Sequence, residues 1–167
     1  MIDSDKFSNF DVSIVVPALD MEGCMPTLLK SIESQTLLPR EIVIVDSSAI
    51  NKTAEIVAKW EGAVPISYHK VDLALPGYAR NIGVKESKGE WIAFLDCKTI
   101  PVPDWLEKCA ITAQKNEVFF VCGLTLFEAD TSFKQILRAA SIGCVAHRTL
   151  VGSLVLKESF LETGGFV

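Results

Sequence analysis

The sequence lacks two features that would point to nucleic acid or to a membrane span. Its 167 residues carry a formal net charge of -5, whereas nucleic-acid-binding domains usually present a basic surface. Its apolar runs fall far short of the ~20 residues that a membrane-spanning helix needs. We therefore expect no nucleic-acid partner and no transmembrane helix.

We expect neither paired cysteines nor a secretory leader. The five cysteines are odd in number, and no two of them are spaced as Cys-x-x-Cys. Residues 1–6 are polar and acidic, unlike the basic and then apolar start of a signal peptide. We expect free thiols in a reducing compartment, and hence a cytoplasmic protein that works in the cytosol or at the inner face of the membrane.

Glycine-rich phosphate-binding motifs are also missing. No Gly-x-Gly-x-x-Gly follows the first apolar run, and no Gly-x-x-x-x-Gly-Lys-Ser/Thr occurs anywhere. This argues against a dinucleotide-binding Rossmann fold and against a P-loop NTPase. A nucleotide bound by this chain would need a metal ion, an arginine or a lysine to neutralise its phosphates.

The chain does contain short apolar runs that alternate with amphipathic stretches. Hydrophobic residues make up 49% of the sequence and charged residues 22%, which is typical of a globular protein. Strands are expected at 12–16, 42–45, 66–68, 90–95, 118–124 and 150–156, and helices at 22–35, 52–61, 76–86, 102–115, 132–147 and 157–163. This alternation predicts an α/β fold with a mostly parallel sheet and helices on both faces.

The sequence has no internal repeat and no interdomain linker, so we expect one domain over residues 1–167. A break near residues 129–132 divides it into a part over 12–128 and a second part over 129–167. The expected helix over 132–147 carries Phe133 to Val145 on one side and Lys134 and Arg138 on the other. It is either a core helix or a surface that contacts a membrane peripherally.

Polar residues follow the expected buried strands. They are Asp20 with Glu22, Asp46 with Ser47 and Ser48, and Asp96, and Arg80 with Asn81 opens the helix before the fourth strand. Ligands of open α/β sheets bind beyond the carboxyl ends of the strands. Carboxylates there can accept hydrogen bonds from a base and a ribose, and an arginine can pair with phosphate. Asp96 alone fits a turn residue as well as a site residue.

Five segments occur in a fixed order along the chain. They are Val12 to Asp20, Glu41 to Thr53, Ala79 to Gly83, Gly89 to Asp96, and Gly164 to Phe166. In this order they resemble the segments that mark the inverting glycosyltransferases of family 2. The resemblance implies a GT-A-like three-layer sandwich. It also implies transfer of a sugar from a nucleoside-diphosphate sugar to a glycan or lipid-linked acceptor, with inversion, as in polysaccharide biosynthesis.

The resemblance also assigns roles to single residues. The base and ribose would be lined by Pro17, Ala18, Leu19, Asp20, Asp46 and Ser47. Arg80 would lie near the base or diphosphate, and Asp96 near the ribose or a metal ion. Gly164, Gly165 and Phe166 would face the acceptor, with residues 12–128 binding the nucleotide-sugar and 129–167 beginning the acceptor side.

One departure from the family pattern concerns the metal ion. The family's Asp-x-Asp reads Asp96-Cys97-Lys98 here, so a lysine replaces the acid that would hold Mn²⁺ or Mg²⁺ through hard oxygen ligands. Lys98 either neutralises the diphosphate directly, stands beside a weaker metal site at Asp96, marks a site without turnover, or is a solvated loop residue.

Two further departures concern the base preference and the chemistry. Ser47 replaces a second acid of many relatives and carries no charge. The family's catalytic carboxylate lies beyond Gly-Gly-Phe, and hence beyond Val167, so we expect an N-terminal fragment of a longer enzyme. The alternative is a degenerate module that binds a nucleotide-sugar without transferring it.

Overall fold

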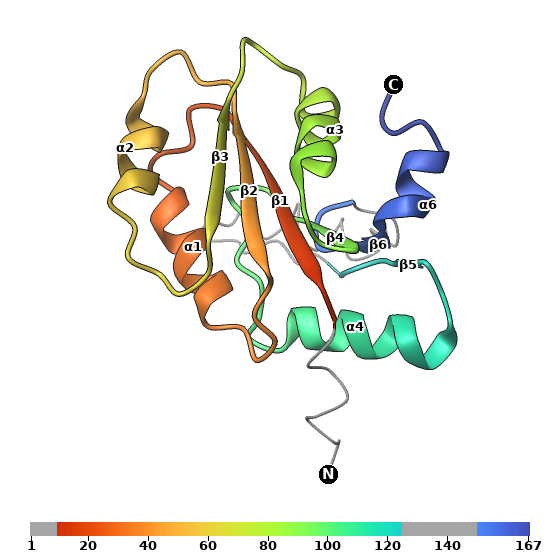
Figure 1. Cartoon of the computed structure of the whole chain (residues 1–167). Coiled ribbons are helices and arrows are strands. Elements are labelled where there is room, and N and C mark those ends of the chain that lie inside the picture. The colour runs from red at the N-terminus through yellow and green to blue at the C-terminus, as the bar shows by residue number, and fades with distance from the viewer. Residues whose placement is uncertain (1–9, 125–149) are drawn as a thin grey trace, which may run out of the picture.

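The computed structural model describes residues 10–124 and 150–167. Within these residues, six strands form one sheet in the order β3-β2-β1-β4-β6-β5 (Figure 1). The strands are β1 (Val12–Ala18), β2 (Glu41–Asp46), β3 (Ile66–Lys70), β4 (Trp91–Phe94), β5 (Phe120–Val121) and β6 (Leu154–Leu156). The first four are parallel, and β6 runs antiparallel to both β4 and β5. The predicted mostly parallel sheet is therefore confirmed.

The central strands are buried because their sequences are continuous apolar runs. Every residue of β2 is buried, and in β1 only Pro17 is partly exposed. β-Branched side chains such as those of Val15 and Ile44 pack well on both faces of a covered parallel sheet. The register pairs Ala18 of β1 with Asp46 of β2, so both strands end at the same edge of the sheet.

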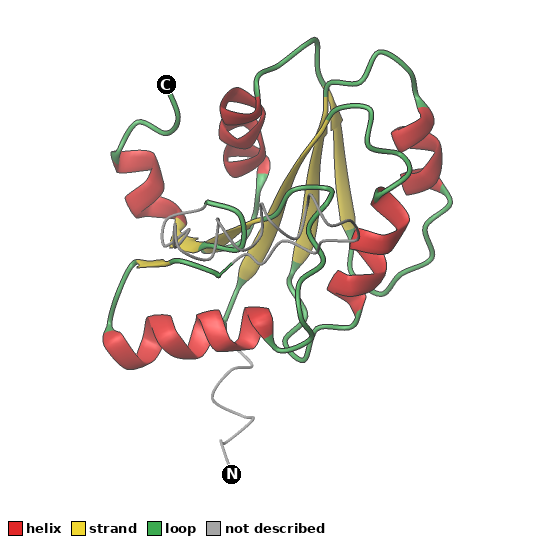
Figure 2. Cartoon of the chain, turned by 180° about the vertical axis from the view of Figure 1, so that it is seen from behind, coloured by secondary structure: helices red, strands yellow, loops and turns green. Residues whose placement is uncertain are grey.

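Helices cover both faces of this sheet, as predicted. They are α1 (Met25–Glu33), α2 (Lys52–Ala58), α3 (Pro76–Glu86), α4 (Trp105–Asn116) and α6 (Lys157–Glu162). Helices α1, α2 and α4 contribute to one apolar cluster, whereas α3 and α6 pack against a second cluster on the other face. Figures 1 and 2 show the sheet between α1 and α2 on one side and α3 and α6 on the other.

Several helix boundaries differ from those expected. Helix α1 begins only at Met25, because residues 21–24 form a turn in which the amide of Cys24 donates to the carbonyl of Met21 at 3.0 Å. Helix α2 ends at Ala58 with Lys59 as its C-cap, so the expected extension to residue 61, with Gly62 just beyond the helix end, was wrong. The expected helix over 132–147 lies outside the described residues.

The expected buried strand over 118–124 was also wrong. Strand β5 contains two residues, and Phe119 and Phe120 are 63% and 47% exposed. The reason is the place of β5 in the sheet: among the described residues it pairs with β6 alone and forms an edge of the sheet. None of the helices in residues 10–124 and 150–167 has the length and apolar character to cross a membrane.

Candidate functional site

The carboxyl ends of β1 and β2 bring the predicted acidic residues together. Directly after the strands, the amide and the hydroxyl of Ser47 both donate to the carbonyl of Ala18, at 2.9 and 3.3 Å. The amide of Asp20 donates to the hydroxyl of Ser48 at 2.8 Å. Ser47, expected to line the base, is buried and ties the two strand ends together.

Asp46 is fully buried, and its carboxylate is engaged on both oxygens. Oδ1 accepts from the amide of Ser48 at 2.9 Å and from the hydroxyl of the same residue. Oδ2 accepts from the hydroxyl of Tyr68 at 2.6 Å and lies 3.5 Å from Nζ of Lys70. Burial raises the pKa of Asp46, but the hydrogen bonds from Ser48 and Tyr68 and the charge of Lys70 outweigh it, so the pKa lies below its usual value.

Asp20 is exposed, in contrast to the buried Asp46. Its backbone φ of 51° is left-handed, a conformation that aspartate tolerates better than most residues. This conformation turns the chain away from β1 after Ala18 and leaves Leu19 and Asp20 exposed. The Asp20 carboxylate is thus the exposed acid of this strand end, while Asp46 is the internal one.

Helix α3 delivers the predicted arginine to the end of β4. Nη2 of Arg80 lies 2.5 Å from Oδ1 of Asp96. The arginine side chain is 13% exposed and that of Asp96 is 44% exposed. Nε of Arg80 is buried and has no hydrogen-bond partner in the part of the chain that the structure describes. This ion pair thus sits at the surface with an unused donor on its buried side.

The Asp96-Cys97-Lys98 segment forms a turn, in which the amide of Thr99 donates to the carbonyl of Asp96 at 2.9 Å. The thiol of Cys97 lies 3.4 Å from the carbonyl of Pro17. Burial, with the nearby Asp96 carboxylate, raises the pKa of Cys97 to about 12, so the thiol stays protonated. The next residue, Lys98, is exposed.

The residues around Asp96 do not fit a divalent ion held by the protein alone. Such an ion takes several hard oxygen ligands, whereas Arg80 already binds one oxygen of Asp96. The next two side chains are a protonated thiol and an exposed ammonium group. In residues 10–124 and 150–167, no group of three or more His, Cys, Asp or Glu side chains could hold a metal ion.

The residues expected on the acceptor side lie against α3. Gly164 and Gly165 have positive φ values of 82° and 76°, which glycine adopts without strain. The side-chain amide of Asn81 hydrogen-bonds both the amide and the carbonyl of Phe166, at 2.9 and 2.8 Å. Figure 1 shows this tail beside α3. Arg80 therefore contacts Asp96, a residue predicted to bind the donor, and Asn81 contacts Phe166, a residue predicted to face the acceptor.

Tyr68 and Lys70 are partners of Asp46 that were not predicted from the sequence. The register of β3 against β2 pairs Ile44 with Tyr68 and Asp46 with Lys70. The two missed side chains are two residues apart, so they share a face of β3. That spacing was a usable signal, although their contact with Asp46 depends on the register.

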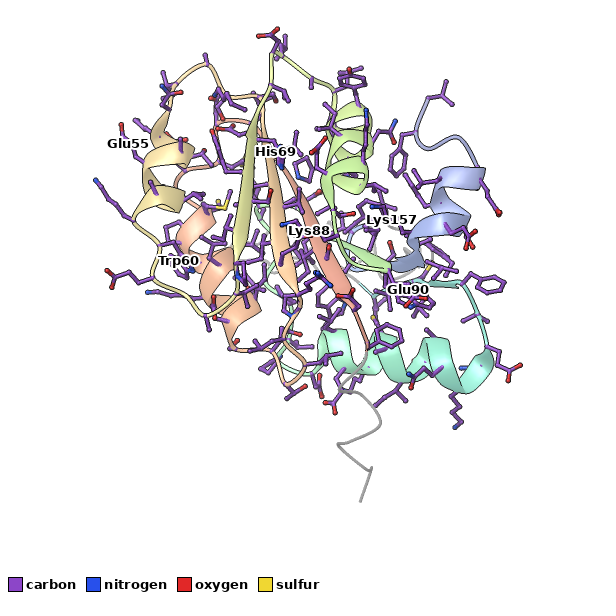
Figure 3. All side chains as sticks on the ribbon, viewed as in Figure 1. Glu55, Trp60, His69, Lys88, Glu90 and Lys157 are labelled. Carbon is purple, nitrogen blue, oxygen red and sulfur yellow. The ribbon has the colours of Figure 1, made fainter. Side chains whose placement is uncertain are left out.

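Open hollows occur at the opposite end of the sheet. They lie around Glu90, Leu156, Lys157 and Phe119, and Figure 3 shows Glu90 and Lys157 near β6. These residues flank the amino end of β4, away from the gathered polar groups. Ligands of open α/β sheets bind at the other end, so the hollows do not define the candidate site.

Solved structures with the same fold are glycosyltransferases. A mannosyltransferase from Pyrobaculum calidifontis, solved with GDP-Man and Mn²⁺, superposes with a TM-score of 0.71 at 21% identity, over 93% of this chain and 47% of that one. Staphylococcus aureus TarS 1-349, solved with UDP-GlcNAc, superposes with a TM-score of 0.68 at 19% identity, over 92% of this chain and 47% of that one. These likenesses confirm the GT-A-like fold.

Sequence relatives agree with the fold. An uncharacterized glycosyltransferase of Haemophilus influenzae is 28% identical over 92% of this chain and 55% of its own length. EpsH of Bacillus subtilis, a putative glycosyltransferase, is 29% identical over 72% of this chain and 35% of its own length. The chain thus spans about half or less of these relatives. The sequence pattern of glycosyl transferase family 2 matches residues 13–151, and the chain belongs to that family.

Proposed function

We propose that this chain forms the donor-binding part of an enzyme that transfers a sugar from a nucleoside-diphosphate sugar, with inversion, to a glycan or lipid-linked acceptor. One observation carries the proposal: Asp20, Asp46, Arg80 and Asp96 gather at the carboxyl edge of the sheet. Strand β1 lies between β2 and β4, so this edge includes the point where the strand order reverses, and ligands of open α/β sheets bind there.

The nucleoside would lie over the turns after β1 and β2. Leu19 and Asp20 are exposed there, whereas Pro17 is partly exposed and Ala18 is buried beneath them. The exposed carboxylate of Asp20 can accept from N–H or hydroxyl donors. The buried Asp46 would support this surface indirectly. It accepts a hydrogen bond from Ser48, and the hydroxyl of Ser48 accepts one from the amide of Asp20. The fold shared with proteins solved with UDP-GlcNAc and GDP-Man supports a nucleotide-sugar as the ligand.

Cationic side chains would neutralise the leaving diphosphate. Arg80 is held at Asp96 and can turn its fork toward phosphate oxygens, which suit its planar geometry. Lys98 is exposed on the next turn and supplies a point charge where relatives place a metal-binding acid. Stabilising the charge that develops on the leaving group is the chemical contribution of such groups. We therefore propose that Lys98 takes over the role of the divalent ion.

The acceptor would approach from the side of Gly164, Gly165 and Phe166. These residues meet the donor half at α3, where Asn81 binds the backbone of Phe166. A second candidate function is binding of a nucleotide-sugar without transfer, which the replacement of an acid by Lys98 favours. Release of nucleoside diphosphate from a donor by the whole protein separates transfer from binding alone.

Calorimetric titration of UDP and GDP, with Mn²⁺ and with EDTA, tests the donor site and the role of Lys98. We expect one of them to bind with or without metal, and Lys98→Ala to weaken binding about tenfold, as loss of a charged hydrogen bond does. Lys108→Ala, an exposed lysine of α4 paired with Asp104, is the matched control and should bind like the parent. Binding that requires Mn²⁺ would overturn the role of Lys98, and a folded protein that binds neither nucleotide would overturn the donor site.

A further inference from the structure

Asn81 makes a contact that joins two distant parts of the chain. Its Oδ1 accepts from the backbone amide of Phe166 at 2.9 Å, and its Nδ2 donates to the carbonyl of the same residue at 2.8 Å. One side chain thus satisfies both backbone groups of a residue that is 85 positions away. A two-point contact of this kind fixes both the position and the orientation of the backbone.

The tail around Phe166 is shaped to fit this contact. A Cβ atom on Gly165 would lie 2.6 Å from Oδ1 of Asn81, and its φ of 76° also favours glycine. The ring of Phe166 packs against Phe94 and Phe160, with ring centres 6.0 and 5.3 Å apart. The tail is therefore anchored by its ring to the sheet and by its backbone to α3.

Arg80, which precedes Asn81 in α3, belongs to the proposed donor site. Arg80 binds Asp96 at 2.5 Å, and Asn81 follows it directly. Helix α3, which carries both residues, packs closely on the sheet. Ala79 and Gly83 are buried, and a Cβ on Gly83 would lie 2.4 Å from Val15. A ligand that restrains Arg80 would therefore also restrain Asn81, since close-packed interiors have low compressibility and transmit strain.

We propose that Asn81 is a positioning residue that couples the donor site at Arg80 to the tail at Gly164–Phe166. This inference rests on the proposed function, because it assumes that a nucleotide binds beside Arg80. A bound nucleotide would hold the tail against α3, and a tail held in place would in turn favour nucleotide binding, because coupling between two sites is reciprocal. Donor binding would in this way prepare the acceptor side.

Hydrogen exchange of the Phe166 amide, with and without UDP, tests the coupling. This amide donates to Asn81, so its exchange rate reports directly on opening of the contact. We expect saturating UDP to slow its exchange about tenfold or more, as ligand linkage requires. If calorimetry shows UDP binding and the exchange changes by less than about twofold, the coupling is refuted while the donor site stands. If GDP binds in place of UDP, the same exchange measurement is made with GDP, and if neither nucleotide binds, the donor site itself fails.

Two variants break the contact from opposite sides. Asn81→Ala removes the side chain from α3, and Gly165→Ala places a methyl group against it without altering the helix. Each should speed exchange of the Phe166 amide about tenfold, the effect of losing one or two hydrogen bonds, and should abolish its dependence on UDP. Asn116→Ala, which removes a side-chain hydrogen bond within α4 at 2.9 Å, is the matched control.

The double variant Asn81→Ala/Gly165→Ala distinguishes loss of this contact from a general loss of stability. If both substitutions act on the same contact, their effects on exchange should not add. Additive effects, or a dependence on UDP that survives in Asn81→Ala, would overturn the role of Asn81. Calorimetry on the same samples should also show that both single variants bind UDP more weakly than Asn116→Ala, since a positioning contact influences the donor side and a local helix contact does not.

Discussion

Asp46 shows how a buried carboxylate is kept charged at this site. An isolated charge without partners would be costly to bury, but Ser48, Tyr68 and Lys70 surround it. Burial and the carboxylate of Asp46 raise the pKa of Tyr68 above its usual value, so its hydroxyl remains a donor. Asp46 therefore stabilises the turn that carries Ser48 and Asp20.

Tyr68→Phe should lower the free energy of unfolding at neutral pH by about 1–3 kcal/mol, because it removes a hydrogen bond to a buried charge. The pKa of Asp46 lies below its unfolded value of about 3.9, so its contribution is present above that pH and is lost as pH falls through the folded pKa. The raised pKa of Tyr68 makes its contribution fade only above about pH 10.

Urea unfolding across the pH range measures the deficit, which is the free energy of unfolding that Tyr68→Phe loses relative to the parent. Tyr78→Phe is the control, because Tyr78 is exposed on α3. We expect the deficit of Tyr68→Phe to be constant from about pH 5 to 9 and to shrink on both sides. A deficit that grows as the pH falls, or one no larger than that of Tyr78→Phe, would contradict the role of Tyr68.

The single residues that the sequence could predict are those next to strand ends. Asp46, Arg80 and Asp96 were expected there, and the structure brings Arg80 and Asp96 into contact. The partners of Asp46 were missed, because Tyr68 is 22 positions away and meets it only through strand register. The contact between Asn81 and Phe166 likewise depends on packing across 85 positions.

Helix α3 carries both Arg80, which pairs with Asp96, and Asn81, which binds the backbone of Phe166. Its bounds, Pro76–Glu86, agree with the expected range, because proline favours a first helical turn. Gly83 lets this helix approach β1, since a Cβ there would lie 2.4 Å from Cγ1 of Val15. The close approach sets how far Arg80 and Asn81 reach over the sheet.

Gly83→Ala should therefore destabilise the protein although alanine favours a helix by about 1 kcal/mol. Val15 is fully buried, so an added methyl group must push α3 away from β1, and such overpacking costs about 1–3 kcal/mol. We expect a lower melting temperature together with weaker UDP binding, measured by calorimetry.

Gly23→Ala is the control for that experiment, because a Cβ there meets nothing within 4 Å. Its stability should stay within about 0.5 kcal/mol of the parent. Equal stability of Gly83→Ala and the parent would show that α3 does not depend on this close approach.

For the whole molecule, the layered sheet was predictable and the strand order was not. Apolar runs alternating with amphipathic stretches predicted the parallel strands and the helices on both faces, which the structure confirms. The antiparallel β6 lies between β4 and β5, and this insertion follows from long-range pairing that leaves no local pattern. The same pairing leaves β5 at the edge with Phe119 and Phe120 exposed.

The proposed nucleotide site lies at the carboxyl edge of β1, β2 and β4. Amide chemical shifts of the labelled protein during titration with UDP test it most directly. We expect the largest shifts at residues 17–20, 46–48, 80–81 and 96–98, with little change around Glu90 and Leu156. Shifts centred on Glu90 and Leu156, at the opposite end of the sheet, would contradict it.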